Sequence, residues 1–273
     1  MLKRALTTVV GLPIVIFLIY WGGLPLVALI ATIAVIGLRE LYIALSGKSV
    51  PIHIVGYLFT IGYFAAIYFF GLWYTQLVVL ALLMIVVQAC MVFFFKKITL
   101  KDCIVVVYGF LYIPFLLAFI IMVRESTLGQ FYVWLIFTSA FGCDTFAYLT
   151  GTTIGKHKLT GTPSPNKSFE GLIGGIVGAA VVGGIYGFFV TQFFEQFYGT
   201  GFIIHAAVIS AVGAVFCVLG DMSASAIKRN TGIKDFGNLF PGHGGVVDRV
   251  DSIVLAAPVV FMIVMWLGAA YAV

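Results

Sequence analysis

Residues 225–252 read SAIKRNTGIKDFGNLFPGHGGVVDRVDS, a short polar segment between two strongly apolar stretches. Four of these residues are Lys or Arg, although only 9% of the 273-residue chain is charged. Each such charge is costly if it enters hydrocarbon without a partner. The segment therefore fixes two features of the fold at once: a membrane helix lies on either side of it, and the chemistry is expected close to the membrane surface.

The composition of the rest of the chain is that of an integral membrane protein. Hydrophobic residues make up 62% and the mean hydropathy is +1.16, whereas soluble proteins are about 45–50% apolar and about 25% charged. A spanning helix needs about 20 mostly apolar residues, and we expect an all-α, polytopic protein with about nine of them. They lie near residues 5–21, 24–45, 52–71, 75–95, 102–123, 131–151, 171–191, 201–228 and 250–271. The four cysteines fall in apolar runs without CxxC spacing, which favours buried thiols over a zinc site or disulfides.

The distribution of basic residues predicts the orientation. With the N-terminus in the cytoplasm, only Arg124 lies on the opposite side. The other Lys and Arg residues, all cytoplasmic, are Lys3, Arg4, Arg39, Lys48, Lys96, Lys97, Lys101, Lys156, Lys158, Lys167, Lys228, Arg229, Lys234 and Arg249. The positive-inside rule therefore favours a multi-pass protein of the cell (inner) membrane with a cytoplasmic N-terminus. No soluble basic module is present, which argues against a nucleic-acid partner.

Four aspartates are expected at the cytoplasmic membrane boundary: Asp144, Asp221, Asp248 and Asp251. Asp248 and Asp251 are three residues apart, so they share a face if the last helix has begun there. Ionisable residues within spans most often serve function, although pairing with nearby cations is the simpler explanation for any single one. Hard oxygen ligands suit Mg²⁺, which is held by one or two carboxylates together with substrate phosphates.

Two polar loops carry the other candidate residues. Pro241, Gly242, His243, Gly244 and Gly245 form a turn whose backbone N–H groups are able to face a phosphate just before the last helix. The loop at 155–171 reads GKHKLTGTPSPNKSFEG; its turn directs Asn166 and Lys167 toward the membrane boundary, and Ser168 to Glu170 are suited to begin a helix. We interpret Lys156, His157 and Lys158 as a solvated basic face.

The spacing of these residues resembles that of the phosphatidate cytidylyltransferase (CDP-diacylglycerol synthase) family. The matching positions are Ser225, Lys228, Arg229, Lys234, Asp235, the 241–245 turn, Asp248, Arg249, Asp251 and Ser252, with a second motif at 164–171. The resemblance covers essentially the whole chain, although the first four helices carry no motif. It suggests one membrane domain over 1–273, in which helices of 1–100 act as scaffold or dimer surface and 101–273 are catalytic.

The resemblance implies a reaction in which CTP and phosphatidate give CDP-diacylglycerol and pyrophosphate, with Mg²⁺ required. It also allows a second cation such as K⁺, and it implies a homodimer in contact with membrane lipid. On this basis Asp221 and Asp248 hold Mg²⁺, and Asp144 and Asp251 support a second ion or the first. The expected phosphate contacts are Lys167, Lys228, Arg229, Lys234 and Arg249, and the other expected substrate-binding residues are Asn166, Ser225, Gly242, His243, Gly244 and Gly245.

Other functions remain open at this point. A CTP-dependent polyprenol or phytol kinase would share the helices, but its chemistry calls for a base acting on a hydroxyl group. A CDP-alcohol phosphotransferase would carry acids four apart after a DGxxAR pattern, which the chain lacks. An ion transporter would place broken helices symmetrically in two halves, whereas the polar residues here crowd the second half.

Overall fold

The computed structural model describes residues 2–48, 50–71, 73–165, 167–194, 197, 201–239 and 244–271. These residues are helical apart from their connections and one isolated β-bridge between Lys158 and Ser168, which confirms the all-α prediction. Eight of the described helices are long and apolar enough to cross a membrane. The expected span near 5–21 is also helical, and the total of nine spans stays a prediction.

The chain divides into two compact units. Unit 1 consists of Met1–Ile121 with Asn230–Arg249, and unit 2 consists of Met122–Arg229 with Val250–Val273. The central polar segment at 230–249 thus packs with the N-terminal helices. The sequence gives no sign of this association, because the segment and those helices are far apart along the chain.

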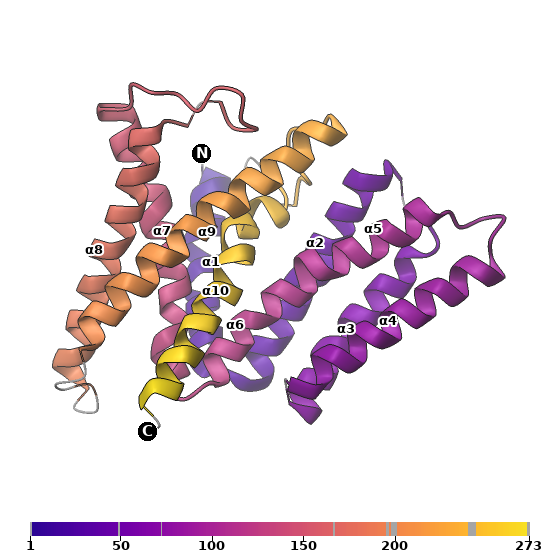
Figure 1. Ribbon diagram of the computed structural model, residues 1–273, viewed down its shortest axis with the longest axis horizontal. Helices are drawn as coiled ribbons and strands as arrows, with labels where there is room; N and C mark the ends of the chain where they lie inside the picture. The colour runs from indigo at the N-terminus through magenta and orange to yellow at the C-terminus, as the bar shows by residue number, and fades with distance from the viewer. Residues whose placement is uncertain are drawn as a thin grey trace. The chain divides into compact units, whose positions relative to one another are not determined.

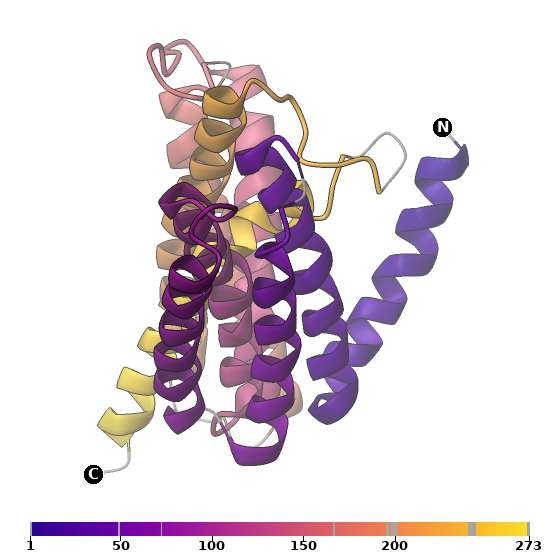
Figure 2. The ribbon, with the colours of Figure 1, turned by 90° about the vertical axis from the view of Figure 1, so that its right-hand side faces the viewer.

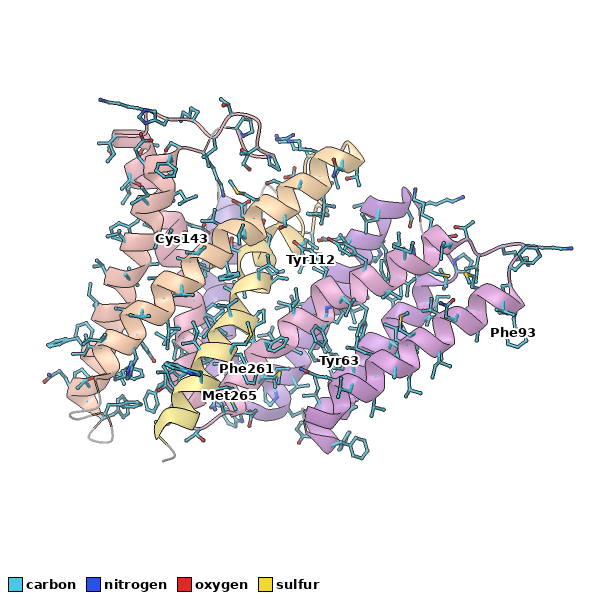
Figure 3. The ribbon with its side chains drawn as sticks, viewed as in Figure 1. Tyr63, Phe93, Tyr112, Cys143, Phe261 and Met265 are labelled. Carbon is cyan, nitrogen blue, oxygen red and sulfur yellow. The ribbon has the colours of Figure 1, made fainter. Side chains whose placement is uncertain are left out.

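Unit 1 is built from the N-terminal helices, each close to its predicted position. They are α1 (Leu2–Trp21), α2 (Gly23–Ser46), α3 (His53–Phe70), α4 (Trp73–Phe93), α5 (Leu100–Phe110), η1 (Leu111–Phe115) and the first part of α6 (Leu116–Glu125). After the turn at Gly22, α1 leans away from α2 (Figure 2). Phe93, at the end of α4, projects outward in Figure 3 and is 81% exposed, as expected of a side chain that faces lipid.

The fifth predicted span contains a feature that the sequence analysis did not anticipate. Thr99 and Asp102 form a capping box that starts α5. The helix then widens into the π-helical turn η1, which holds Pro114, before it continues as α6. Proline supplies no N–H and clashes with the preceding turn, and a local π-turn is one way to accommodate it without ending the helix.

The centre of unit 1 is the buried side chain of Tyr42 on α2. Its hydroxyl donates to the Val106 carbonyl oxygen of α5 at 3.0 Å, and its ring stacks on His53 of α3. A Cβ atom at Gly56 or Gly109 would overlap this ring. The three helices therefore approach closely around one aromatic side chain, and His53 is part of this packing.

Unit 2 contains the helices that carry most of the polar candidates. They are the end of α6, α7 (Gly129–Thr153), α8 (Phe169–Phe193), α9 (Phe202–Thr231) and α10 (Val247–Tyr271). Helix α9 belongs to this unit up to residue 229, and α10 belongs to it from residue 250 onward. Figure 1 shows α7 and α8 side by side, with their connecting loop at one end. Small residues allow this contact: a Cβ at Gly142 would lie 2.9 Å from the Ala179 Cα, and one at Gly178 would overlap the Phe146 ring.

Candidate active site

Three of the four predicted aspartates lie in unit 2. Asp144 is near the end of α7, Asp221 is on α9, and Asp251 is on α10. Asp221 lies within electrostatic range of both Asp144 and Asp251. Gly220 makes this possible, because it packs against the Asp251 backbone without room for a Cβ. Helices α9 and α10 therefore cross in contact beside their acidic residues.

The Asp221 carboxylate forms an ion pair with the Lys167 ammonium group, which comes from the loop before α8. Both groups remain partly accessible, with 37% of the Lys167 side chain and 27% of the Asp221 side chain exposed. Lys167 also lies within electrostatic range of Asp144. Residues 54 apart in sequence thus form one charged cluster, in which a single cation is shared by two anions.

This cluster lines a cavity of about 400 Å³ in unit 2. Its polar lining is Asp144, Thr152, Lys158, Lys167, Ser168 and Asp221, and its remaining lining is Cys143, Ala147, Tyr148, Gly151, Leu159, Gly171, Leu172 and Val218. Cys143, labelled in Figure 3, lies on α7, and its thiol is 3.8 Å from the Ala214 carbonyl oxygen of α9. The cavity therefore combines charged groups with an apolar wall, which suits a ligand with a phosphate group and a hydrocarbon part.

The loop between α7 and α8 is ordered by Glu170. The carboxylate of Glu170 accepts the backbone N–H groups of Lys156 and His157, each at 3.1 Å, and also contacts the His157 ring. Ser168 caps α8 by accepting the Gly171 N–H, which confirms the predicted helix start. Folding back in this way brings Lys158 to the cavity lining, although the residue remains exposed.

The end of α9 carries three further candidates. Ser225 accepts a hydrogen bond from the Ser164 hydroxyl at 3.2 Å, which ties the helix to the same loop. Lys228 lies within electrostatic range of Asp251, and Arg229 is exposed in the last turn. The first two are thus gathered near the charged cluster, and Arg229 lies one residue further along the helix.

Asp248 lies in unit 1, in the first turn of α10. One of its carboxylate oxygens accepts the backbone N–H groups of Phe236 at 2.9 Å and Gly245 at 3.0 Å. Gly244 has a φ of 82°, a conformation that favours glycine, and a Cβ there would lie 2.9 Å from this carboxylate. Gly244 and Gly245 are therefore folded against Asp248.

Lys234 and Arg249 are exposed. Asn166, Gly242 and His243 lie outside the described residues, as does Pro241.

Glu40 of α2 is a further candidate that was not predicted from the sequence. Its side chain is buried, with 6% of the residue exposed, and its carboxylate accepts the Val247 N–H at the start of α10, at 3.0 Å. The signal was available, because Glu40 is the single acidic residue within the predicted span at 24–45 and such residues are costly in a membrane. What the sequence could not supply was its partner, which lies 207 residues away.

The carboxylates fit the chemistry of a Mg²⁺ site that is completed by substrate. No group of three His, Cys, Asp or Glu side chains is placed to hold a metal ion within the part of the chain that the structure describes. Mg²⁺ usually retains several waters and takes one or two carboxylates together with phosphate oxygens. Asp221 with one nearby carboxylate, Asp144 or Asp251, has the donor types of such a site.

The fold is that of a polytopic helical membrane protein, and unit 2 holds a charged cavity. The chain belongs to the cytidylyltransferase family, whose model matches residues 2–267. It is 35% identical to a phosphatidate cytidylyltransferase of Rickettsia bellii over 181 residues, which cover 66% of this chain and 78% of that protein.

Two further relatives carry the same name. The protein from Rickettsia felis is 32% identical over 192 residues, covering 70% of this chain and 83% of the relative. The protein from Haemophilus influenzae is 40% identical over 131 residues, covering 48% of this chain and 44% of the relative.

Proposed function

We propose that this enzyme transfers the cytidylyl group of CTP to phosphatidate, giving CDP-diacylglycerol and pyrophosphate. The observation that carries the proposal is the Lys167–Asp221 ion pair in a cavity of about 400 Å³ with an apolar wall. Phosphatidate has an anionic headgroup on a hydrocarbon body, and such a cavity offers complementary surfaces to both. The names of the family and of its relatives support the same reaction.

The reaction needs positioning and charge neutralisation more than proton transfer. A phosphate oxygen of phosphatidate attacks the α-phosphorus of CTP; a new P–O bond forms while the bond from the α-phosphorus to the bridging oxygen breaks. Pyrophosphate leaves with the electron pair. The attacking oxygen is already anionic, so a strong general base is unnecessary. The cavity accordingly presents lysines and carboxylates.

Lys167 and Lys158 are the cavity residues suited to hold phosphate oxygens. Fixed cations stabilise charge that accumulates on the transferring phosphoryl group. Lys167 is held by Asp221, and its side chain lines the cavity. Lys228, Arg229, Lys234 and Arg249 are proposed as further phosphate contacts.

Asp144, Asp221, Asp248 and Asp251 are proposed as the residues that hold Mg²⁺, with a second cation such as K⁺ near the same set. When bound, such ions would neutralise charge on the attacking and leaving oxygens. The carboxylates' own task is to fix the donor positions from the ends of α7, α9 and α10.

The proposed setting is the inner membrane, with the site open to the cytoplasm and the protein a homodimer. The basic residues gather on one side by the positive-inside rule, and CTP is available on that side. The acyl chains of phosphatidate remain in the bilayer throughout, so a site at the membrane boundary lets the two substrates meet.

A direct assay tests this function. Purified protein is given CTP, phosphatidate and Mg²⁺, and the products are identified by mass spectrometry. CDP-diacylglycerol with pyrophosphate is the expected result. Formation of CDP with a phosphorylated alcohol would instead identify the kinase, and ion uptake into proteoliposomes without CTP turnover would identify a transporter.

A further inference from the structure

The buried carboxylate of Glu40 has a specific set of neighbours. It lies within α2, yet among the described residues no Lys, Arg or His side chain forms an ion pair with it. Its hydrogen-bond donor is the backbone N–H of Val247, the first residue of α10. The positive end of a helix stabilises an anion at that position, so the α10 N-terminus takes the place of a basic side chain.

The polar segment closes around this carboxylate. Gly237 and Gly245 both lie so close that a Cβ atom at either would overlap the carboxylate group. Gly245 also donates its N–H to Asp248, the residue after Val247. Glu40 therefore lies against the segment at Gly237 and Gly245 and accepts a hydrogen bond from it at Val247. Val247 directly precedes Asp248, and Gly245 is hydrogen-bonded to the Asp248 carboxylate.

We propose that Glu40 is a positioning residue that fixes Asp248 for catalysis, an inference that rests on the proposed function. Glu40 holds the Val247 N–H, and Asp248 holds those of Phe236 and Gly245. Two carboxylates from distant parts of the chain thus lock three amides of one segment. Without Glu40 the first turn of α10 loses its anchor, and the Asp248 carboxylate loses its fixed direction. In this way α2, which carries no family motif, takes part in the site.

Kinetics of three purified full-length variants test the role. Glu40→Ala is expected to lower kcat about 10- to 100-fold, the usual effect of removing a residue that orients a metal-binding carboxylate, and to raise the Mg²⁺ concentration needed for half-maximal rate. The KM for phosphatidate should stay unchanged. Glu40→Gln should lose less, because its amide oxygen can still accept the Val247 N–H. Arg39→Gln, an exposed neighbour on the same helix, is the matched control and should behave as the unaltered protein.

Limited proteolysis supplies a readout that does not depend on activity. Lys234 is exposed within the same segment, so trypsin should cut there faster in Glu40→Ala than in the unaltered protein or in Arg39→Gln. If Glu40→Ala does not fold, Glu40→Gln and Gly237→Ala replace it, since a methyl group at Gly237 would displace the carboxylate without removing it.

The outcomes separate this inference from the proposed function. Equal cleavage rates at Lys234, or an unchanged kcat and Mg²⁺ requirement in Glu40→Ala, would overturn the role of Glu40 even if the unaltered protein makes CDP-diacylglycerol. Absence of turnover by the unaltered protein would refute the proposed function and leave the cleavage comparison to decide whether Glu40 anchors the segment.

Discussion

The Lys167–Asp221 ion pair gives the sharpest test of the charged cavity, through Lys167→Met, Asp221→Asn and the double variant. Removing one partner leaves the other charge in a partly enclosed site. Exposed ion pairs contribute about 0.2–1 kcal/mol, and breaking a buried pair costs about 3–5 kcal/mol. With 37% and 27% of the two side chains exposed, each single variant should lose about 1–3 kcal/mol of stability, an interpolation between these limits. The double variant should recover part of this loss, because it leaves no unpaired charge.

Activity should follow a different pattern. Each single variant is expected to lower kcat on the order of 100- to 1000-fold, the scale for loss of one group that stabilises developing charge. Residues that act as a unit lose their effects together, so the double variant should be about as slow as the slower single variant. The assay is CDP-diacylglycerol formation from labelled CTP, with thermal unfolding in detergent measured alongside. Losses that multiply in the double variant, or a kcat for Lys167→Met equal to that of the unaltered protein, would contradict the reasoning.

Three further outcomes are expected. Asp248→Asn should lower turnover on the order of 100-fold or more. Its thermal unfolding should change little, because the amide oxygen can still accept N–H groups. Near-normal Mg²⁺-dependent activity would show that Asp248 is not part of the site. Lys158→Ala should lower kcat/KM for CTP about 10-fold, because it removes one charge-assisted contact of about 1.5 kcal/mol. Lys156→Ala is the control: Lys156 lies outside the cavity lining, so kcat/KM should stay unchanged. Equal effects of the two substitutions would support the interpretation of Lys158 as a solvated charge. Gly178→Ala should lower the midpoint of thermal unfolding, because overpacking costs about 1–3 kcal/mol. Gly184→Ala should not, because a Cβ added there would lie 3.7 Å from its nearest neighbouring atom. Equal midpoints for the two variants would show that α7 and α8 can separate without penalty.

The helices were predictable because the membrane makes their signal strong. A run of about 20 apolar residues between polar turns has few alternatives in a bilayer, and each predicted span overlaps an observed helix. The π-helical turn at Leu111–Phe115 was not predicted. A proline within an apolar run is compatible with a kink, a break or a π-turn, and packing against neighbouring helices decides among them.

The candidate site was predictable in its residue types and only partly in its contacts. Intramembrane charges identify Asp144 and Asp221 as candidates without any structure, and the turn of the 155–171 loop identifies Lys167. Which of them pair depends on how helices and loops distant in sequence pack, as the separation of Lys167 and Asp221 illustrates. The place of Lys158 in the cavity lining could not be predicted for the same reason, because it depends on a loop fold that Glu170 secures.

The acidic residues of the structure differ in how their charge is held, and this difference bears on mechanism. Glu40 and Asp248 accept hydrogen bonds from backbone amides, whose positions are fixed by the fold. Asp221 is bound by a lysine side chain, whose flexible stem lets its ammonium group exchange one anion for another. We therefore expect the amide-held carboxylates to keep their places when substrate arrives, while Lys167 turns from Asp221 to a phosphate and leaves that carboxylate available to a cation.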